Sequence, residues 1–595
     1  MKRLFIFCLI IFFNSSVNSQ GLDSRFALIP WPESVSEMPG DFLLNSAVTV
    51  FVVSDTLRSD VALLNQFLGD QYDIRLQVKN GKRAFDGAIF LSDQGSQDLP
   101  VGSYQLKVAP NQIEIIGTGS EGVFYGLQTL MQLIPAGRSD TYKIPCVNIT
   151  DKPRFSYRGM HLDVSRHFFP VGFVRRYIDI LSKYKMNYFH WHLTDDQGWR
   201  IEIKSHPELQ KISAWRNGTR IGHYSSLPEK YDTVRYGGYY TQDEIRQVVR
   251  YAAQRHVTVV PEIEMPGHAL AALAANPQLS CTGGPFQTAR TWGVFPDVYC
   301  TREETFTFMN DVLKEVCSLF PGPYVHIGGD ECPKERWKAC ANCQAVIKRE
   351  KLKDEHELQS WFVRRIGKIL EANGKKMIGW DEILEGGLAP DATVMSWRGY
   401  QGGIDAARQA HDVIMTPTSY CYFDYYQSRN PGEPLAIGGY LPIEKVYSFE
   451  PVPAELSKDE AKHILGAQGN LWTEYILNLS MAEVAVLPRM CALAEVVWSP
   501  RQQRDYDRFM TRLYSHLKML QFQGLSYSKA VYDVVMTVKP DNGKGLSIAL
   551  STPYKNGLIR YSLSEELPNG NSPVYTEPFK IDQSLAIRTK VFDGT

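Results

Sequence analysis

The spacing of hydrophobic residues changes twice along the chain and divides it into three structured parts. Residues 20–150 alternate short strand-like runs with two helical stretches, near Val61–Leu68 and over Glu121–Leu133. Residues 151–525 alternate apolar strands with amphipathic helices, a pattern that predicts parallel strands joined by helical crossovers. In residues 526–595, short strand candidates are separated by Pro, Gly and Asn turns, which favours a small β-sandwich-like domain.

The first part is predicted to be a small α/β domain with a supporting role, because it contains no group of residues suited to catalysis. Two of its strand candidates form a hairpin with Asn111 in the turn. The strand candidates are Val48–Val53, Ile74–Val78, Ala88–Leu91, Tyr104–Val108 and Ile113–Ile116.

The middle part contains eight strand candidates separated by helical segments. Eight such strands in roughly 350 residues match a (β/α)8 TIM barrel with inserted loops. One intervening helix begins at a capping box, Thr241-x-x-Glu244, and another carries an apolar stripe from Met309 to Phe320. The predicted fold class is therefore α/β, a barrel preceded by a small α/β domain and followed by a small β-sandwich-like domain. The barrel strand candidates are Ser156–Leu162, Tyr188–Leu193, Val257–Ile263, Tyr324–Ile327, Lys376–Gly379, Ala392–Ser396, Asp412–Thr416 and Ile464–Gln468.

The composition of the chain excludes some classes of partner. Its 595 residues include 64 Lys and Arg against 65 Asp and Glu, and the net charge of −1 provides no basic footprint for a nucleic acid. Aromatic residues make up 12% of the chain, which is compatible with sugar rings stacking on aromatic faces.

The N-terminus has the pattern of a secretory signal peptide. Lys2 and Arg3 precede an apolar run, Leu4–Phe13, that is too short to span a bilayer, and a polar segment follows. We expect residues 1–19 to be removed before Gln20, and the protein to be periplasmic or extracellular, with no membrane insertion after cleavage.

The cysteines of an exported chain are expected to form disulfides. Cys281 and Cys300 bracket a loop that contains Gly and Pro, and they are the first candidate pair. Cys332, Cys340 and Cys343 form a second group. Only one Cys-x-x-Cys occurs, without a second pair at zinc-finger spacing, so a disulfide that staples a loop is favoured over zinc.

The most informative stretch is Tyr324–Glu331, a short buried strand that runs through Gly328 and Gly329 into Asp330 and Glu331. Carboxylates of α/β barrel enzymes act at such strand ends. Successive strand residues point to opposite faces, so this pair alone cannot flank a scissile bond as an ordinary glycosidase pair does. Two close carboxylates raise one pKa, which favours one protonated acid beside one ionised partner. The plain alternative is a strand end that caps the next helix.

The other strand ends predict a mouth lined by aromatic rings, carboxylates and one arginine, a mixture that suits sugars. Three histidines, His190, His192 and His268, could also suggest a metal. However, His-x-His on a strand lacks the helical spacing of a zinc hydrolase, and a histidine bonded to a carboxylate, as His268 could be with Glu264, is the simpler interpretation.

Five motifs together resemble those of the family 20 glycoside hydrolases, the β-N-acetylhexosaminidases. The resemblance extends over the predicted mature chain and implies substrate-assisted retention, in which the 2-acetamido carbonyl of the sugar attacks C1. The motifs are Arg158-Gly159-x-x-x-Asp163-x-Ser165-Arg166-His167, His190-Trp191-His192-Leu193-x-Asp195-Asp196-Gln197, Pro261-Glu262-Ile263-Glu264-Met265-Pro266-Gly267-His268, His326-Ile327-Gly328-Gly329-Asp330-Glu331 and Leu471-Trp472-Thr473-Glu474.

The resemblance also implies residue roles. Glu331 would protonate the leaving oxygen and later activate water, Asp330 would hold the acetamido N–H, and Tyr422 would donate to its oxygen. The remaining predicted site residues are Trp380, Trp397 and Trp472 around the sugar face, Arg166, Asp424 and Glu474 for its hydroxyls, and Asp195, His268 and Glu264 as support for the acids. No metal and no cofactor is implied.

Two positions depart from the family pattern. Relatives often carry Asp at the position of Glu264, and many have a further Trp where this chain reads Leu435–Tyr440. The expected function is an exported, exo-acting β-N-acetylhexosaminidase that releases terminal GlcNAc or GalNAc from glycans or chito-oligosaccharides. A metal-dependent deacetylase and a non-catalytic glycan-binding protein are the alternatives.

Overall fold

Eight parallel strands close into a barrel at the centre of the molecule, which confirms the predicted fold class. The computed structural model describes residues 25–593, except 84, 542–544 and 556. Every predicted barrel strand is present, with bounds that agree to within one residue. In barrel order the strands are β8 (Tyr157–Asp163), β9 (Tyr188–His192), β16 (Thr258–Glu262), β17 (Tyr324–His326), β18 (Lys376–Trp380), β19 (Thr393–Ser396), β20 (Val413–Met415) and β21 (Ile464–Gly469).

The barrel strands are nearly continuous apolar runs because both of their faces are covered. Tyr157, Val260 and Ile414 belong to the cluster that fills the lumen, while a larger hydrophobic cluster joins the strands to the surrounding helices. The register sets histidines and an acid side by side: Glu262 of β16 is the partner of His192 on β9 and of His326 on β17.

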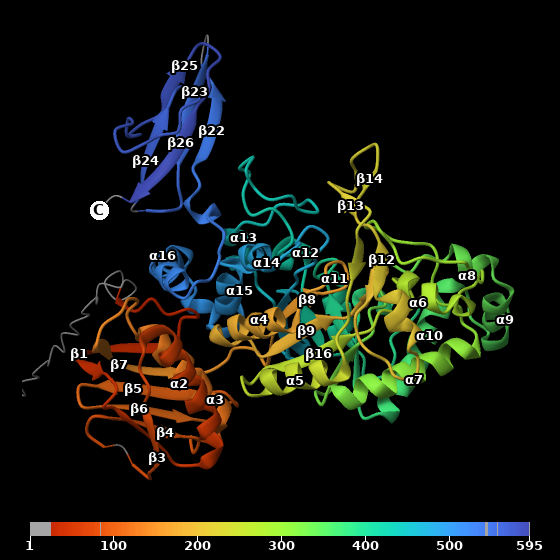
Figure 1. The fold of residues 1–595 in the computed structure, drawn as a ribbon, viewed down its shortest axis with the longest axis horizontal. Coiled ribbons are helices and arrows are strands. Elements are labelled where there is room, and N and C mark those ends of the chain that lie inside the picture. The colour runs from red at the N-terminus through yellow and green to blue at the C-terminus, as the bar shows by residue number, and fades with distance from the viewer. Residues whose placement is uncertain (1–24, 84, 542–544, 556, 594–595) are drawn as a thin grey trace, which may run out of the picture.

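Helices surround the barrel as the alternating pattern predicts (Figure 1). The capping box forms, since Thr241 accepts from the backbone of Glu244 and Glu244 accepts from that of Thr241. The predicted apolar stripe on α7 is buried from Met309 to Val316. The longer helices are α4 (Val171–Lys183), α5 (Gln242–Ala253), α7 (Glu303–Leu319), α9 (Ala341–Glu350), α10 (Glu355–Ala372), α11 (Gln401–Arg408), α14 (Leu479–Val486), α15 (Arg489–Trp498) and α16 (Tyr506–Phe522).

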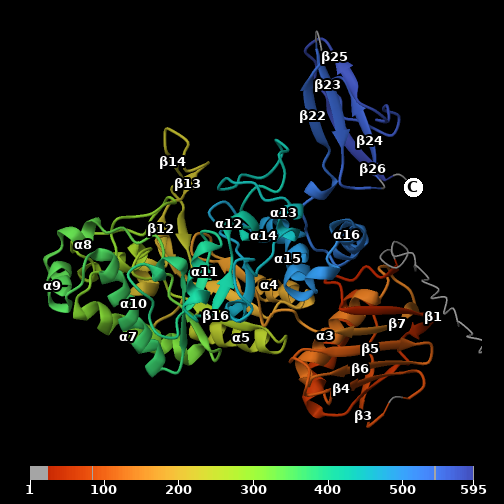
Figure 2. The ribbon, with the colours of Figure 1, turned by 180° about the vertical axis from the view of Figure 1, so that it is seen from behind.

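The N-terminal domain is a seven-stranded sheet on which two helices pack (Figure 2). Two of its strands were not predicted from the sequence. In β1 most side chains are exposed and a proline interrupts the run, while Pro145 lies within β7; both features weaken a strand pattern. The elements are β1 (Ser34–Leu44), β2 (Thr49–Val52), α2 (Arg58–Tyr72), β3 (Gln77–Asn80), β4 (Ala88–Ser92), β5 (Tyr104–Ala109), β6 (Gln112–Gly117), α3 (Gly119–Leu133) and β7 (Tyr142–Asp151).

The C-terminal residues form two small sheets that project away from the barrel (Figure 1). Ile548, Leu550 and Ile559 make the core between them. One sheet contains β22 (Val535–Pro540), β23 (Leu546–Ser551) and β25 (Phe579–Ile581), of which β25 was not predicted; the other contains β24 (Gly557–Ser562) and β26 (Arg588–Asp593).

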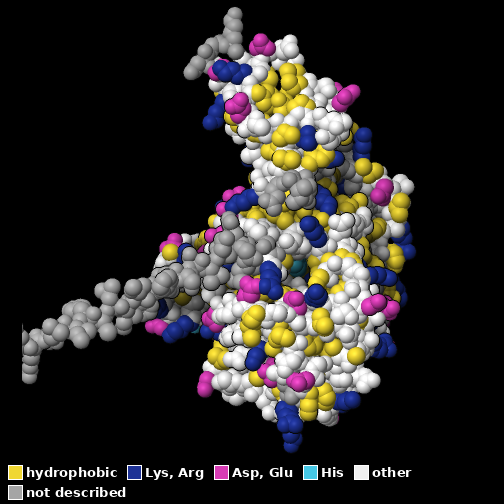
Figure 3. Space-filling model, turned by 90° about the vertical axis from the view of Figure 1, so that its left-hand side faces the viewer, with side chains coloured by type: hydrophobic (Ala, Val, Ile, Leu, Met, Phe, Trp, Pro, Cys, Tyr) yellow, Lys and Arg dark blue, Asp and Glu magenta, His cyan; other side chains and the backbone are white. Residues whose placement is uncertain are grey.

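On the face of the molecule seen in Figure 3, acidic and basic side chains are interspersed, in keeping with the balanced charge.

The predicted signal peptide, residues 1–19, lies outside the described residues, so its cleavage stays a prediction. Among the described helices, none combines the length and the apolar character needed to cross a bilayer.

The predicted disulfide between Cys281 and Cys300 is wrong for this structure. All nine cysteines of the described residues are free thiols. Cys281 and Cys300 are therefore not bonded to each other. Each sulfur atom lies 3.7 Å from that of Cys343, which is also much farther than the roughly 2.05 Å of a disulfide.

Asp151 joins the N-terminal domain to the barrel through a buried group of polar contacts. It accepts hydrogen bonds from Tyr104 Oη at 2.7 Å, from Lys185 Nζ at 3.0 Å and from Trp498 Nε1 at 2.9 Å. Trp498 is the last residue of α15, yet its ring is part of the hydrophobic core of the N-terminal domain. The interface therefore depends on a carboxylate that neutralises a buried lysine.

We predict that Asp151→Ala lowers the free energy of unfolding by about 3–5 kcal/mol, because Lys185 is left as an unpaired buried charge. Chemical denaturation monitored by tryptophan fluorescence measures the loss. Asp459→Ala is the matched control: its pair with Lys462 is exposed, so we expect a change within about 0.5 kcal/mol. Equal effects of the two substitutions would contradict the assignment.

Candidate active site

The twelve predicted site residues line one cavity of about 170 Å³ where the barrel strands end. Tyr425, which the sequence did not indicate, and Ile437, which belongs to the departing stretch Leu435–Tyr440, line it as well. A larger cavity of about 280 Å³, between the N-terminal domain and the barrel, contains none of the predicted residues. The predicted residues around the smaller cavity are Arg166, Asp195, Glu264, His268, Asp330, Glu331, Trp380, Trp397, Tyr422, Asp424, Trp472 and Glu474.

The loop after β17 turns sharply so that both adjacent acids reach the cavity. Gly328 and Gly329 have φ of +69° and +92°, and Glu331 has φ of +44°. A Cβ on Gly328 would lie 1.6 Å from Oε2 of Glu264, so only glycine fits there. The left-handed backbone at Glu331 costs about 1–2 kcal/mol, which the surrounding contacts must offset. Because the strand ends before them, Asp330 and Glu331 do not alternate between faces as strand residues would.

His268 links the acid pair to two other carboxylates. Its Nδ1 lies 2.9 Å from Asp196 and 3.3 Å from Asp195, and its Nε2 lies 3.4 Å from Glu331 and 3.8 Å from Asp330. Burial opposes its charge, but Asp195 and the hydrogen-bonded carboxylates raise the pKa of His268 well above its usual range. We conclude that His268 is an imidazolium.

The predicted bond between His268 and Glu264 is wrong. Neither carboxyl oxygen of Glu264 has a hydrogen-bond partner among the described residues. Burial, reinforced by the charge of Asp330, raises the pKa of Glu264 well above its usual range. His268 bonds to Asp196 instead, because the loop after β9 brings that carboxylate to its Nδ1. The sequence did not indicate that Asp196 would be its partner.

The two adjacent acids differ in their protonation. Burial, opposed by His268 and reinforced by Glu331, raises the pKa of Asp330 to about 7. The hydrogen bond with His268 lowers the pKa of Glu331, whose side chain keeps 40% of its exposure against 12% for Asp330. Without a ligand, therefore, Asp330 is the member that carries a proton near neutral pH. Its Oδ1 atom has no partner among the described residues, which leaves it open to a ligand.

Arg166 is held in the wall of the cavity by several contacts of its guanidinium group. Its guanidinium contacts Asp195 at 2.8 Å, Gln197 at 2.9 Å and Asp163 at 3.4 Å, and lies 5.0 Å from the ring centre of Trp472. These contacts hold the charge in place for a polar ligand.

Two carboxyl groups, Asp424 and Glu474, face the same region. Burial, with the neighbouring Glu474, raises the pKa of Asp424 well above its usual range. Burial also raises the pKa of Glu474, although Arg166 opposes the shift. Oδ1 of Asp424 has no hydrogen-bond partner among the described residues. These groups can therefore exchange hydrogen bonds with the hydroxyls of a ligand.

Aromatic rings form a wall of the cavity. The ring centres of Trp380 and Trp472 are 5.9 Å apart, those of Tyr422 and Trp472 are 6.4 Å apart, and Trp397 stacks with Tyr422 at 6.3 Å. The indole N–H groups of Trp380 and Trp397 donate to Glu262 and Glu382, each at 2.9 Å. Because their polar edges are occupied by these acids, the rings offer apolar surface to a ligand.

Glu262 is the main functional residue that the sequence analysis missed. It contacts His192 at 2.5 Å, His326 at 2.8 Å and His190 at 3.1 Å. His192 contacts Asp195 at 2.9 Å through its other nitrogen, so a chain of charged groups runs from Glu262 to His268. The parallel register of β9, β16 and β17 brings these residues together, and the histidines at the strand ends were the available signal.

Glu382 is a second residue that was missed. It follows β18 and accepts the N–H of Trp397. Burial, reinforced by the charge of Asp330, raises the pKa of Glu382 to about 8. It therefore orients Trp397 as a largely neutral acid.

The departure at Leu435–Tyr440 also has a structural outcome. Ile437, within this stretch, lines the cavity, and its backbone carbonyl oxygen lies 3.0 Å from Nε2 of His223. The stretch therefore contributes an aliphatic side chain to the cavity wall.

Comparison with known proteins gives consistent matches over most of the chain. The model of "Glycosyl hydrolase family 20, catalytic domain" matches residues 155–501, and that of "Glycosyl hydrolase family 20, domain 2" matches residues 25–152. A β-hexosaminidase of Porphyromonas gingivalis is 42% identical over 590 residues, which cover 96% of this chain and 74% of the relative. A β-hexosaminidase of Vibrio furnissii is 37% identical over 479 residues, 79% of this chain and 76% of the relative.

Solved structures agree with these matches. The GH20 exo-β-N-acetylglucosaminidase of Vibrio harveyi, in complex with N-acetylglucosamine, has a TM-score of 0.76 at 36% identity, covering 85% of this chain and 79% of that one. The β-N-acetylhexosaminidase of Bacteroides fragilis has a TM-score of 0.72 at 32% identity, covering 84% of this chain and 97% of that one.

We predict that Gly328→Ala lowers activity by about 100-fold or more, because the new methyl group would displace Glu264 and shift the acid pair out of position. Steady-state kinetics on an aryl glycoside measures the effect. Gly87→Ala is the matched control, since Gly87 has a similar φ of +72° with nothing within 4 Å of its Cβ position. If both variants keep wild-type activity, the steric requirement at Gly328 is refuted.

Proposed function

The chain belongs to glycosyl hydrolase family 20, and from this membership we propose that it uses the 2-acetamido group of its substrate as the nucleophile. It is a glycoside hydrolase of the β-hexosaminidase type. The observation that carries the proposal is the placement of Asp330 and Glu331 in one cavity from a single turn, with Tyr422 on its wall. Two acids that enter from the same loop suit a reaction in which the substrate itself supplies the attacking atom.

In the first step, the acetamido oxygen forms a bond to C1 while the bond from C1 to the leaving oxygen breaks. Glu331 donates its proton to that leaving oxygen. Asp330 accepts the acetamido N–H and stabilises the positive charge of the oxazolinium ring, while Tyr422 donates to the acetamido oxygen.

In the second step, Glu331 takes a proton from water as the water attacks C1. The bond from C1 to the acetamido oxygen breaks and the amide is restored. Two inversions at C1 leave its β configuration unchanged.

Substrate binding must shift the single proton of the acid pair from Asp330 to Glu331. In the free protein Asp330 is the protonated member and Glu331 is ionised. An acetamido N–H is a donor, and an ionised Asp330 accepts it more strongly than a protonated Asp330 does. Binding therefore favours the arrangement in which the single proton resides on Glu331, and His268, within 3.8 Å of both acids, stabilises the remaining negative charge.

The rest of the cavity supports recognition of one terminal sugar. Arg166, Asp424 and Glu474 offer charged and neutral partners for hydroxyls, and the tryptophan wall suits the acetamido methyl group and the sugar face. This arrangement favours exo-acting release of β-linked GlcNAc or GalNAc from glycans or chito-oligosaccharides.

We also propose that the enzyme is exported to the periplasm or the exterior, on the basis of the predicted signal sequence in residues 1–19.

The two alternative functions have less support. A metal-dependent deacetylase would need open histidines, but His190 and His192 contact the buried Glu262, and His268 contacts Asp195 and Asp196. A glycan-binding protein would not need an acid pair with separated pKa values. Analysis of products from an N-acetylglucosaminide distinguishes them, since hydrolysis yields free GlcNAc, deacetylation yields acetate, and binding yields neither.

We predict that Glu331→Gln abolishes hydrolysis of aryl-GlcNAc substrates while the protein stays folded, because an amide cannot protonate the leaving oxygen. Glu335→Gln is the matched control, an exposed acid four residues along the same segment that should keep full activity. An unchanged rate in Glu331→Gln would disprove its role.

An aryl glucoside with a hydroxyl in place of the acetamido group should barely react with the wild type, because it lacks the attacking oxygen. Comparable rates on both substrates would exclude substrate assistance.

We predict that kcat/KM falls as the pH rises through about 7. A raised pKa means that Asp330 keeps its proton below that pH and loses it above, so the acid pair then lacks the one proton that the first step requires. In Asp330→Asn the residual activity should depend on Glu331 alone, whose pKa is lowered, and the falling limb should move to lower pH. A constant kcat/KM up to about pH 9, with unchanged tryptophan fluorescence, would contradict this assignment.

A further inference from the structure

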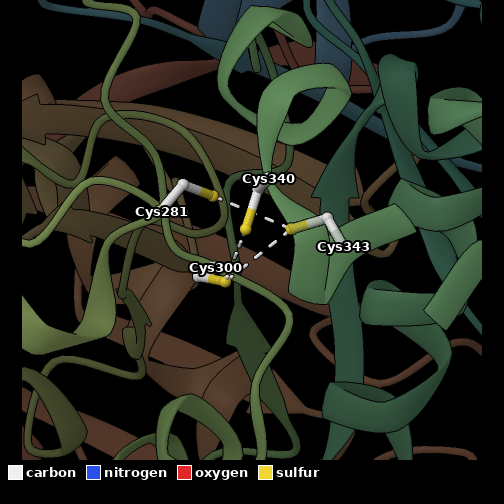
Figure 4. A group of neighbouring side chains, drawn as sticks. All are labelled: Cys281, Cys300, Cys340 and Cys343. Carbon is white, nitrogen blue, oxygen red and sulfur yellow. Dashed lines mark hydrogen bonds between the residues drawn. The ribbon is translucent and has the colours of Figure 1, made fainter. Parts of the chain in front are cut away.

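Four cysteine side chains converge beside the loops that carry the catalytic acids. Figure 4 shows Cys281 and Cys300 approaching from one side and Cys340 and Cys343 from the other. The Sγ atoms of Cys281 and Cys343, of Cys300 and Cys340, and of Cys300 and Cys343 are each 3.7 Å apart. All four sulfur atoms lie within 4.8 Å of one another.

The sulfur separations decide between a metal and disulfides. A zinc ion bound by four thiolates at about 2.3 Å requires tetrahedral S···S edges of about 3.8 Å, whereas a disulfide requires about 2.05 Å. The observed 3.7 Å matches the edge of the tetrahedron. We propose that Cys281, Cys300, Cys340 and Cys343 bind a structural zinc ion.

The backbone presents the ligands as two pairs, as structural zinc sites do. An isolated bridge between Ser280 and Tyr299, followed by a bond from the Cys300 N–H to the carbonyl of Leu279, holds Cys281 and Cys300 on adjacent segments. Cys340 and Cys343 form the Cys-x-x-Cys whose first member immediately precedes α9 (Ala341–Glu350). The sequence concealed this site because Cys281 and Cys300 are brought together by the fold and not by a short spacing in the chain.

The surroundings of the cluster suit a closed tetrathiolate site. Cys300, Cys340 and Cys343 are buried in a hydrophobic cluster with Trp337 and Val346, and Cys281 packs against its edge. Four thiolates and one Zn²⁺ carry a net negative charge, and Arg302 lies beside Cys300 to offset part of it. No histidine or carboxylate joins the four sulfurs within the described residues, and a set of four cysteines is typical of structural zinc.

The zinc ion would join the two loops on which catalysis depends. Cys281 and Cys300 lie in the segment after β16, which begins with Glu264 and His268, while Cys340 and Cys343 follow Asp330 and Glu331 after β17. Tyr299 strengthens the same connection: its N–H donates to the carbonyl of Pro266 at 3.0 Å, and its carbonyl accepts the N–H of Trp337 at 2.9 Å. The ion thereby fixes His268 relative to the acid pair without touching the substrate.

The first experiment measures the metal directly in the full-length protein. Elemental analysis should find about one zinc ion per chain, and protein refolded with Co²⁺ should show the thiolate-to-cobalt charge-transfer band of a tetrahedral site. Protein that contains no zinc after refolding in reductant with one equivalent of Zn²⁺ would overturn the proposal. A mass lower by two or four hydrogens, which reports one or two disulfides, would overturn it as well.

The second experiment uses variants with a matched control. Cys340→Ser and Cys343→Ser should lose zinc and unfold at lower temperature, whereas Cys317→Ser, a half-buried cysteine of α7 outside the cluster, should keep both properties. If the cluster variants do not fold, titration of the wild type with a mercurial reagent replaces them, and zinc should be released as four thiols react. Release unrelated to thiol modification, or full zinc content in Cys343→Ser, would refute the site. These readouts do not depend on glycosidase activity, so they separate this proposal from the proposed reaction.

Discussion

Charge compensation around His268 is the constraint on which the arrangement of the active site depends. Asp195, Asp196, Asp330 and Glu331 all lie within 3.8 Å of this one ring. Carboxylates so close together cannot all be ionised in a buried place unless a positive charge lies between them. A histidine suits this position because its two ring nitrogens point in opposite directions and can each serve a different pair of acids.

The network of charged groups continues below the cavity, to His192 and Glu262. Burial opposes the charge of His192, but Glu262 and Asp195 raise its pKa to about 10. Glu262 is thus the fixed negative end of a chain that passes through His192 and Asp195 to His268. Burial raises the pKa values of Glu264, Asp424 and Glu382, and the cations near them compensate this effect only in part. The site therefore contains both ionised and neutral acids. The ionised ones compensate buried cations, and the neutral ones can donate a hydrogen bond as well as accept one.

This arrangement requires a strained backbone, which the surrounding structure must hold in place. His268 and Glu331 both have a left-handed backbone, with φ of +48° and +44°, and Gly328 leaves room for Glu264. Such strain persists only where neighbouring structure fixes the chain. The contacts of Tyr299 and the proposed zinc ion would fix the two loops at their outer side, while the closed barrel fixes the strand ends from which they start.

The sequence by itself determined the architecture and which side chains meet in the cavity. Eight apolar runs separated by amphipathic helices predicted the barrel strands to within one residue, because burial on both faces leaves a local signature that does not depend on the partner strand. The order of acids and tryptophans at the strand ends predicted which side chains share the cavity, because parallel strands of a barrel all end on one face. The N-terminal strands β1 and β7 left a weaker signature, since exposed side chains and proline interrupt their pattern.

Only the tertiary structure decided how these residues pair. The partners of Glu262 follow from the register of three strands, the bond of His268 to Asp196 follows from the shape of two loops, and the meeting of Cys281 and Cys300 with Cys340 and Cys343 follows from the packing of those loops on each other. A hydrophobic pattern reports which side of an element is buried. It does not report which distant group lies opposite, because that is set by long-range packing of the whole chain.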